Sequence, residues 1–255
     1  MHPVLFKIGP ITIYTYGVFV FLGVISVYWL SLREAQGSKI DKEKFSNLFF
    51  WTVISGFIGA RLLYVLLEWR WFIKHPFEVI FSSSGFVFYG GIIGGVIAFC
   101  IFVRKYGWSL KKIADIVGVY IPCGHAIGRL GCFYYGCCYG KPTNSWIGIL
   151  FPPESPAGML REKVIPTQLI SSFFLLLIFI FLIILKKYKK FDGQIILSYF
   201  ILYGIFRFII EFFRGDPRGF IGIFSLSQWL SIIIIAIAFC LWVKSYKIAQ
   251  RKFLL

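Results

Sequence analysis

The feature that most constrains this chain is an apolar segment, roughly 20 residues long, that recurs from one end to the other. A segment of this length with few charges predicts a helix that crosses a membrane. Seven such segments can be marked, at about 11–32, 46–68, 85–103, 112–131, 166–185, 194–213 and 223–243. We therefore predict an all-α membrane protein with seven transmembrane helices. Residues 1–255 form its single polytopic domain, and residues 132–165 form an extracytoplasmic loop or head segment.

The composition supports this class and excludes another. Hydrophobic residues make up 58% of the chain, yet its net charge is +16. In a soluble protein this charge would suggest nucleic acid as a partner, whereas in a membrane protein basic loops meet anionic lipid. We expect membrane lipid as the partner and no nucleic acid. The first residues, 1–10, carry no basic run, so we expect the first apolar segment to remain as a helix and not to be cleaved as a signal peptide.

Lysine and arginine in the connections predict the orientation. Four connections carry four basic residues each: 33–45, 104–112, 186–193 and the tail after 243. They alternate with connections that together carry eight basic residues. Since basic loops stay in the cytoplasm, the N-terminus is predicted outside and the C-terminus inside.

Three arginines fall inside apolar segments: Arg61, Arg129 and Arg207. All three lie in the later part of segments that run outward, so they are expected at a similar depth in the outer half of the bilayer. A charge at such depth indicates a functional site. We favour a shared polar cavity over separate structural roles. The alternative is pairing with carboxylates, since Glu211 follows Arg207 by four residues and Glu68 follows Arg61 by seven, whereas Arg129 has no such neighbour.

A guanidinium group presents a planar set of donors that matches phosphate, and the nearest phosphates are those of phospholipid headgroups. Tyr203, Arg207 and Glu211 share one helix face at four-residue spacing, and Arg214 follows. These residues, with Arg129, predict a phospholipid-binding site. Tyr89-Gly90-Gly91 opens the third segment, where the glycines favour close helix packing. The functional alternative is approach of a lipid headgroup to these glycines, with the Tyr89 hydroxyl directed into the site.

Four of the six cysteines lie between residues 123 and 140. For Cys132, Cys137 and Cys138 we rank a disulfide or inert thiols first, thiol chemistry second and metal binding third, because the spacing is not a familiar zinc pattern. No metal and no cofactor are therefore expected. His125 precedes Arg129 by four residues. A nearby guanidinium disfavours the protonated imidazole, which suits a neutral general base, although a lone histidine in a span is often structural.

Together these motifs resemble the prolipoprotein diacylglyceryl transferases, bacterial inner-membrane enzymes with seven spans and a site open to the outer leaflet. The resemblance covers nearly the whole chain, and its most specific stretch is Gly128-Arg129-Leu130-Gly131. It also rests on Phe6–Ile11, Tyr16-Gly17, Gly59–Tyr64, Gly90-Gly91, Pro166-Thr167-Gln168, Tyr203–Arg207 and Glu211–Arg214.

The resemblance implies transfer of diacylglyceryl from phosphatidylglycerol to the lipobox cysteine of a prolipoprotein, with release of glycerol phosphate. It assigns the phosphate to Arg129 and the leaving group to Arg207 with Tyr203. Cations aimed at a departing phosphate are what this chemistry needs. The expected catalytic residues are Arg129, Arg207, Tyr89 and His125. The expected substrate-binding residues are Arg129, Tyr16, Arg61, Gly90, Gly91, Cys132, Gly140, Tyr203, Glu211 and Arg214.

The chain departs from the family pattern at four positions. Tyr89 stands for a histidine, Cys132 for an asparagine, Cys137 for a glutamate and Ser171 for another glutamate. The resemblance therefore leaves the general base open, with Tyr89 and His125 as candidates. Two alternative functions follow: a phospholipid-dependent transferase with another acceptor, and a non-catalytic lipid-binding or transport protein. The second is disfavoured because the sequence lacks the repeated broken helices of transporters.

Overall fold

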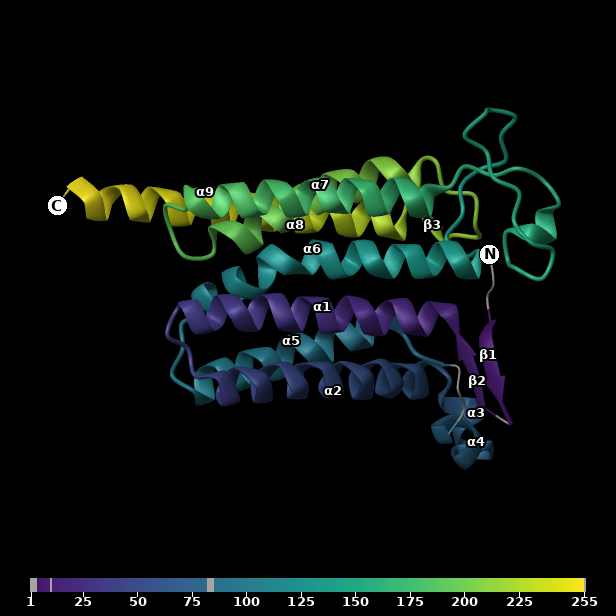
Figure 1. The fold of residues 1–255 in the computed structure, drawn as a ribbon, viewed down its shortest axis with the longest axis horizontal. Helices are drawn as coiled ribbons and strands as arrows, with labels where there is room; N and C mark the ends of the chain where they lie inside the picture. Colours follow the sequence, from purple (N-terminus) through teal and green to yellow (C-terminus); the bar gives the residue numbers. More distant parts are fainter. Residues whose placement is uncertain (1–3, 10, 82–84, 255) are drawn as a thin grey trace. The chain divides into compact units, whose positions relative to one another are not determined.

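The computed structural model describes residues 4–9, 11–81 and 85–254. Among these residues, seven helices are long and apolar enough to cross a membrane, which confirms the predicted fold class (Figure 1). They are α1 (Thr15–Gly37), α2 (Lys42–Leu67), α5 (Phe88–Lys105), α6 (Leu110–Tyr135), α7 (Thr167–Lys187), α8 (Gln194–Glu211) and α9 (Leu226–Leu254). The shorter elements are β1 (Val4–Ile8), β2 (Ile11–Tyr14), α3 (Trp69–Lys74), α4 (Pro76–Phe81), β3 (Phe220–Ile221), β4 (Phe224–Ser225) and a 3-10 turn at Gly158–Leu160.

Several helix boundaries differ from the sequence prediction. Residues 11–14 do not start the first helix but form β2, which pairs antiparallel with β1. The last apolar segment, predicted from residue 223, begins with strand β4 of the β3–β4 hairpin, and its helix starts only at Leu226. Short apolar runs next to a glycine turn suit a strand as well as a helix, so hydrophobicity alone places these ends wrongly. In addition, α6 continues to Tyr135, beyond the predicted start of the loop.

The chain divides into two compact units. One contains residues up to Ser31 and from Ala114 onward; the other contains Leu32–Ile113. Helices α1 and α6 therefore each contribute to both. Whether the two form the single domain predicted from the sequence stays a prediction. We call them the larger and the smaller unit and describe each separately.

The smaller unit is a close pair of helices, α2 and α5. A Cβ atom on Gly90 would collide with the carbonyl of Gly59, and one on Gly94 would collide with the carbonyl of Ser55. The backbones of the two helices therefore touch, as small residues allow in membrane helices. The Val87 N–H donates to the Ala60 carbonyl at 3.1 Å and fixes the start of α5. The glycines after Tyr89 thus have the packing role that the sequence favoured.

The larger unit has a core between α6, α7 and α8, formed by Val119, Ile178, Leu182, Ile195 and Tyr199. Helix α9 packs beside α8. The segment between α6 and α7 folds at one end of this unit around its own small core of Tyr139, Phe151, Ala157 and Val164 (Figure 1). This segment and the ends of α6 and α8 position the residues discussed below.

A glycine contact joins α1 to α6 in the larger unit. A Cβ on Gly124 would lie 2.7 Å from the Gly23 carbonyl oxygen and would collide with a methyl group of Val27. We expect Gly124→Ala to lower the free energy of unfolding by about 1–3 kcal/mol, because overpacking forces the helices apart. Thermal unfolding in detergent measures this. Gly17→Ala, where a new Cβ meets no atom within 4 Å, is the control; an equal loss in both variants would contradict the prediction.

A buried aspartate on α6 caps α8. Asp115 accepts hydrogen bonds from the backbone N–H groups of Gly193 (2.7 Å), Ile195 (3.0 Å) and Ile196 (3.0 Å). Gly193 adopts φ +94° and has no side chain with which to cap the helix, so Asp115 supplies the acceptor from a distant helix. Lys189 completes the group, with its Nζ 3.0 Å from Asp115 and 2.7 Å from Asp192.

We expect Asp115→Ala to cost about 2–3 kcal/mol, because it leaves helix N–H groups buried without a partner. Asp192→Ala removes only the partly exposed member of the same group and is expected to cost below about 1 kcal/mol. Burial lowers the pKa of Lys189, but its bonds to Asp192 and Asp115 outweigh burial and raise it. The stability that protonated Lys189 gives the folded state is therefore complete below the ordinary lysine pKa and is lost as the pH rises through the raised pKa. Unfolding midpoints of both variants and of the wild type, measured at neutral and at alkaline pH, test both predictions.

Candidate functional site

The candidate site lies at the end of the larger unit where α6 and α8 end. Nine of the thirteen residues predicted from the sequence belong to this unit: Tyr16, His125, Arg129, Cys132, Gly140, Tyr203, Arg207, Glu211 and Arg214. The other four, Arg61, Tyr89, Gly90 and Gly91, belong to the smaller unit and are placed only within it.

Among the described residues, Arg129 forms no ion pair with a carboxylate, unlike Arg207 and Arg214. Its guanidinium group interacts with the Tyr203 hydroxyl and lies near Cys132 and Cys138. His125, one helical turn earlier on α6, meets the Tyr203 ring edge to face at a centroid distance of 5.1 Å. Tyr203 stacks in turn on buried Tyr199 at 5.7 Å. The aromatic side chains thus fix Tyr203, and Tyr203 orients a guanidinium group that no carboxylate pairs with among the described residues.

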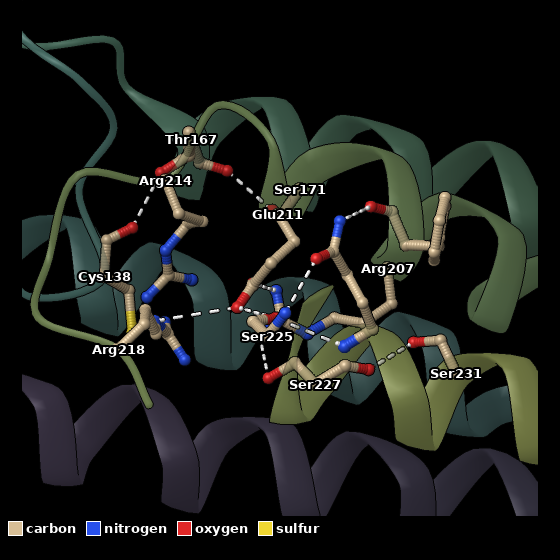
Figure 2. Close-up of polar contacts among 12 residues, drawn as sticks. Cys138, Thr167, Ser171, Arg207, Glu211, Arg214, Arg218, Ser225, Ser227 and Ser231 are labelled. Carbon is tan, nitrogen blue, oxygen red and sulfur yellow. Dashed lines mark hydrogen bonds and ion pairs between the residues drawn. The ribbon is translucent and has the colours of Figure 1, made fainter. Parts of the chain in front are cut away.

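Arg207, by contrast, is paired. Its Nη1 lies 2.7 Å from the Glu211 carboxylate, and its Nη2 donates to the Ser227 hydroxyl at 3.0 Å (Figure 2). Glu211 also accepts a hydrogen bond of 2.9 Å from Ser225, and Arg218 lies 3.8 Å away. Glu211 is buried, so this carboxylate depends on these cations and hydroxyls. The carboxylate pairing considered for Arg207 from the sequence is therefore present, and it balances much of that charge.

Arg214 and Arg218 share one aspartate beyond the end of α8. Arg214 donates two hydrogen bonds to Asp216, at 2.8 and 2.7 Å, and Arg218 donates to the same carboxylate at 3.0 Å. Burial raises the pKa of Asp216, although the charge of Arg214 opposes it. Sequence reasoning missed Asp216, Arg218, Ser225 and Ser227. For Asp216 and Arg218, the alternating charges in Arg214-Gly215-Asp216-Pro217-Arg218 could have indicated an ion pair. No sequence pattern marks Ser225 or Ser227.

Gly140 joins the two loops of the site. Its backbone pairs with that of Arg214 in an isolated bridge, and its N–H donates to the Ile165 carbonyl at 2.9 Å. A Cβ here would lie 2.6 Å from that carbonyl oxygen, so only glycine fits. Gly140 therefore acts through the backbone that holds the loops together.

The cysteine-containing turn follows α6. Gly136, with φ +79°, ends the helix, and its N–H donates to the Cys132 carbonyl at 2.9 Å. Gln168 donates to the Cys137 carbonyl and Thr167 to the Cys138 carbonyl, each at 2.7 Å. Both side chains are fully buried. The Pro166-Thr167-Gln168 motif thus clamps the turn that carries the cysteines; Figure 2 shows the Thr167 contact.

All six cysteines are free thiols in the structure. The sulfur atoms of Cys132, Cys137 and Cys138 lie within 4.8 Å of one another. Thiol hydrogen bonds from Cys132 and Cys137, helped by the charges of Arg214 and Arg129, lower the pKa of Cys138 below its ordinary value against the opposing effect of burial. Exposed Tyr16 lies near the same thiols and near Arg129.

In the smaller unit, Arg61 donates to the Gly85 carbonyl at 3.0 Å, and its guanidinium lies over the rings of Phe86 (5.1 Å) and Tyr64 (5.7 Å). Tyr89 is exposed at the start of α5 beside Phe88. The structure thus gives Arg61 aromatic and backbone partners within its own unit.

Comparison with known proteins gives a consistent answer. Residues 3–244 match the family described as prolipoprotein diacylglyceryl transferase. The chain is 38% identical over 239 residues to phosphatidylglycerol–prolipoprotein diacylglyceryl transferase 2 of Clostridium perfringens, covering 92% of each chain. It is 35% identical to the transferase of that name from Clostridium tetani, covering 93% of this chain and 95% of the relative. The Finegoldia magna relative is 37% identical, with 97% of each chain covered.

Proposed function

Since this chain belongs to the prolipoprotein diacylglyceryl transferase family, we propose that it transfers the diacylglyceryl group of phosphatidylglycerol to the lipobox cysteine of prolipoproteins. In this reaction the acceptor thiol loses its proton, a carbon–sulfur bond forms at the glyceryl carbon, and the bond from that carbon to the phosphate oxygen breaks. Glycerol phosphate leaves with the electron pair. The step belongs to lipoprotein maturation and is a substitution without oxidation or reduction.

The observation that carries this proposal is the guanidinium group of Arg129, which lies beside Tyr203 and has no carboxylate partner among the described residues. A charged group at membrane depth needs a partner, and a lipid phosphate provides one with matching geometry. The phosphate gains negative charge as the carbon–oxygen bond breaks, so a cation already in place stabilises the transition state more than the ground state. Arg129 is the residue to which we assign this role.

The remaining residues are assigned by their contacts. Tyr203 orients Arg129, and Arg207 adds positive potential while its pairing with Glu211 holds α8 against the start of α9. Arg214 and Gly140 shape the loops, and Tyr16 and Cys132 border the cysteine turn. We assign Arg61, Tyr89, Gly90 and Gly91 to the substrate-binding set on the resemblance alone. Either His125 or Tyr89 serves as the proton acceptor unless the thiol is activated in another way.

We also propose that the protein lies in the bacterial inner membrane, with the N-terminus outside and this site facing the outer leaflet. The alternation of basic loops supports this orientation. Cysteine labelling at single introduced positions in the 136–166 segment and in the 186–193 connection tests it. Labelling of the second connection, but not the first, by an impermeant reagent added to intact cells would contradict the orientation.

The test of the proposed function is turnover of phosphatidylglycerol in liposomes with two peptides that differ only at the lipobox cysteine, one with cysteine and one with serine. We expect only the cysteine peptide to gain a diacylglyceryl group. Release of glycerol phosphate with neither peptide modified would favour a transferase with another acceptor. Binding of phosphatidylglycerol without any turnover would favour a lipid-binding protein.

A further inference from the structure

Three cysteines of the larger unit form a cluster to which the transfer reaction described above assigns no chemical step. Cys132, Cys137 and Cys138, which we call the cysteine cluster, each direct one sulfur into a group no wider than 4.8 Å. We propose that the cysteine cluster binds a zinc ion through three thiolates and leaves a fourth position for the thiol of the acceptor. The role of the fourth position rests on the proposed function; the metal site does not.

The distances suit this ion. Zinc bound tetrahedrally by cysteine, with bonds of about 2.3 Å, separates two sulfur atoms by about 3.8 Å. The sulfur atoms of the cysteine cluster therefore need to approach by about 1 Å at most, which rotation of half-buried side chains provides. Thiolates favour soft metals such as zinc over calcium or magnesium, which take oxygen ligands.

The backbone builds this group, although the sequence spacing alone did not suggest it. The N–H groups of Gly136 and Cys137 both donate to the Cys132 carbonyl, at 2.9 and 3.2 Å, so the chain turns back over the last turn of α6. Cys138 adopts φ +62°, which is uncommon for a residue with a side chain. Such strain persists only where the surroundings impose it, and here Thr167 and Gln168 hold the two carbonyls. The cysteine cluster is thus preorganised.

The local charge also fits. Three thiolates with one Zn²⁺ carry a net charge of −1, which is costly inside a protein unless a cation is near. Arg214 and Arg129 both act electrostatically on the Cys138 sulfur. Arg214 is paired with Asp216, so the guanidinium group of Arg129 is the one that can balance this charge. Arg129 is also the residue assigned to the lipid phosphate. The metal site and the phosphate site would therefore be neighbours.

Three protein ligands and an open position are typical of catalytic zinc sites, whereas structural sites have four protein ligands. No fourth histidine, cysteine or carboxylate joins the cysteine cluster among the described residues. A thiol that coordinates zinc is deprotonated outright. The acceptor cysteine would release its proton to solvent on binding, attack the glyceryl carbon as a thiolate, and leave as a thioether while glycerol phosphate departs. This role removes the need for a strong general base.

The test begins with the full-length protein, purified in detergent with a phosphine reductant and no chelator, and with zinc measured by mass spectrometry. We expect about one zinc per chain, in keeping with a single site. Serine substitution of Cys137 or of Cys138 is expected to weaken zinc binding by more than about 100-fold. Loss of a residue that only supports a ligand weakens metal binding by about 10- to 100-fold, and loss of a ligand should weaken it more. Cys123→Ser, a free thiol on α6 outside the cysteine cluster, is the control for folding and zinc content.

Cobalt provides a readout that does not depend on activity. With Co²⁺ in place of zinc, the wild type should show thiolate-to-cobalt charge-transfer absorption. The lipobox cysteine peptide should change this spectrum, whereas the serine peptide should not. An unchanged spectrum would overturn the proposed acceptor position. Absence of zinc and cobalt binding would overturn the site itself, and so would a disulfide within the cysteine cluster of active enzyme purified without reductant. Transfer that persists after zinc is removed would also overturn the activating role. Cobalt binding with the peptide response, but without transfer in any metal form, would support the metal site and reject the proposed function.

Discussion

Arg129→Ala is expected to lower diacylglyceryl transfer by about 100- to 1,000-fold, the range seen when a single preorganised group that stabilises developing charge is removed. The reason is that Arg129, among the arginines in the described part of this site, has no carboxylate partner and is free to bind a phosphate. Arg207 and Arg214, whose charges Glu211 and Asp216 balance, cannot take its place. The measurement is the initial rate of peptide modification in phosphatidylglycerol liposomes.

Two further variants show whether charge or shape is responsible. Arg129→Lys keeps the charge but loses the planar set of donors, so its rate should lie between those of wild type and Arg129→Ala. Arg161→Ala removes an exposed arginine from the segment between α6 and α7 and should leave the rate unchanged. A wild-type rate for Arg129→Ala, with the protein correctly inserted, would show that another group binds the phosphate.

Glu211→Ala is expected to have the largest effect on stability, lowering the free energy of unfolding by about 3–5 kcal/mol, as is typical when one partner of a buried ion pair is removed. It leaves Arg207 without the carboxylate at 2.7 Å and removes the acceptor of the Ser225 hydroxyl (Figure 2). Denaturation in detergent, followed by the loss of tertiary signal, measures the effect.

The double variant Arg207→Ala/Glu211→Ala tests the reason for this loss. Because it removes both charges together, it should be more stable than Glu211→Ala alone. Glu211→Gln retains an acceptor for Ser225 and should lie between Glu211→Ala and the wild type. If the double variant is less stable than the wild type by the sum of the two single-variant losses, the two residues act independently and the ion pair is not the cause.

The seven helices could be predicted because each is a long apolar run, and length is what a membrane demands. Their ends were harder: residues 11–14 are as apolar as the helix that follows, and only their pairing with residues 4–8 makes them a strand. The capping of α8 by Asp115 could not be read from the sequence either. It joins residues nearly eighty positions apart, and no local pattern marks the partner.

The candidate site, too, could be predicted from the sequence only in part. The sequence marked Arg129 as the arginine without a nearby carboxylate in its segment, and the described residues give it none. It offered Glu211 as a partner for Arg207 only as the alternative to a shared cavity, and that pair is present. It did not reveal that Arg214 shares Asp216 with Arg218, or that Thr167 and Gln168 hold the cysteine turn. These contacts depend on how loops fold back, which periodicity does not describe. The three thiols had an unfamiliar spacing for the same reason, since a helix end and a tight turn bring them together.

The most direct test of the central claim is to follow both products of one reaction in phosphatidylglycerol liposomes. Mass spectrometry would measure the diacylglyceryl thioether on the lipobox cysteine, and an enzymatic assay would measure glycerol phosphate. We expect both to appear in equal amounts with the wild type, and both to disappear together with Arg129→Ala. Absence of the thioether with the wild type, under conditions in which a related transferase forms it, would contradict the proposed function.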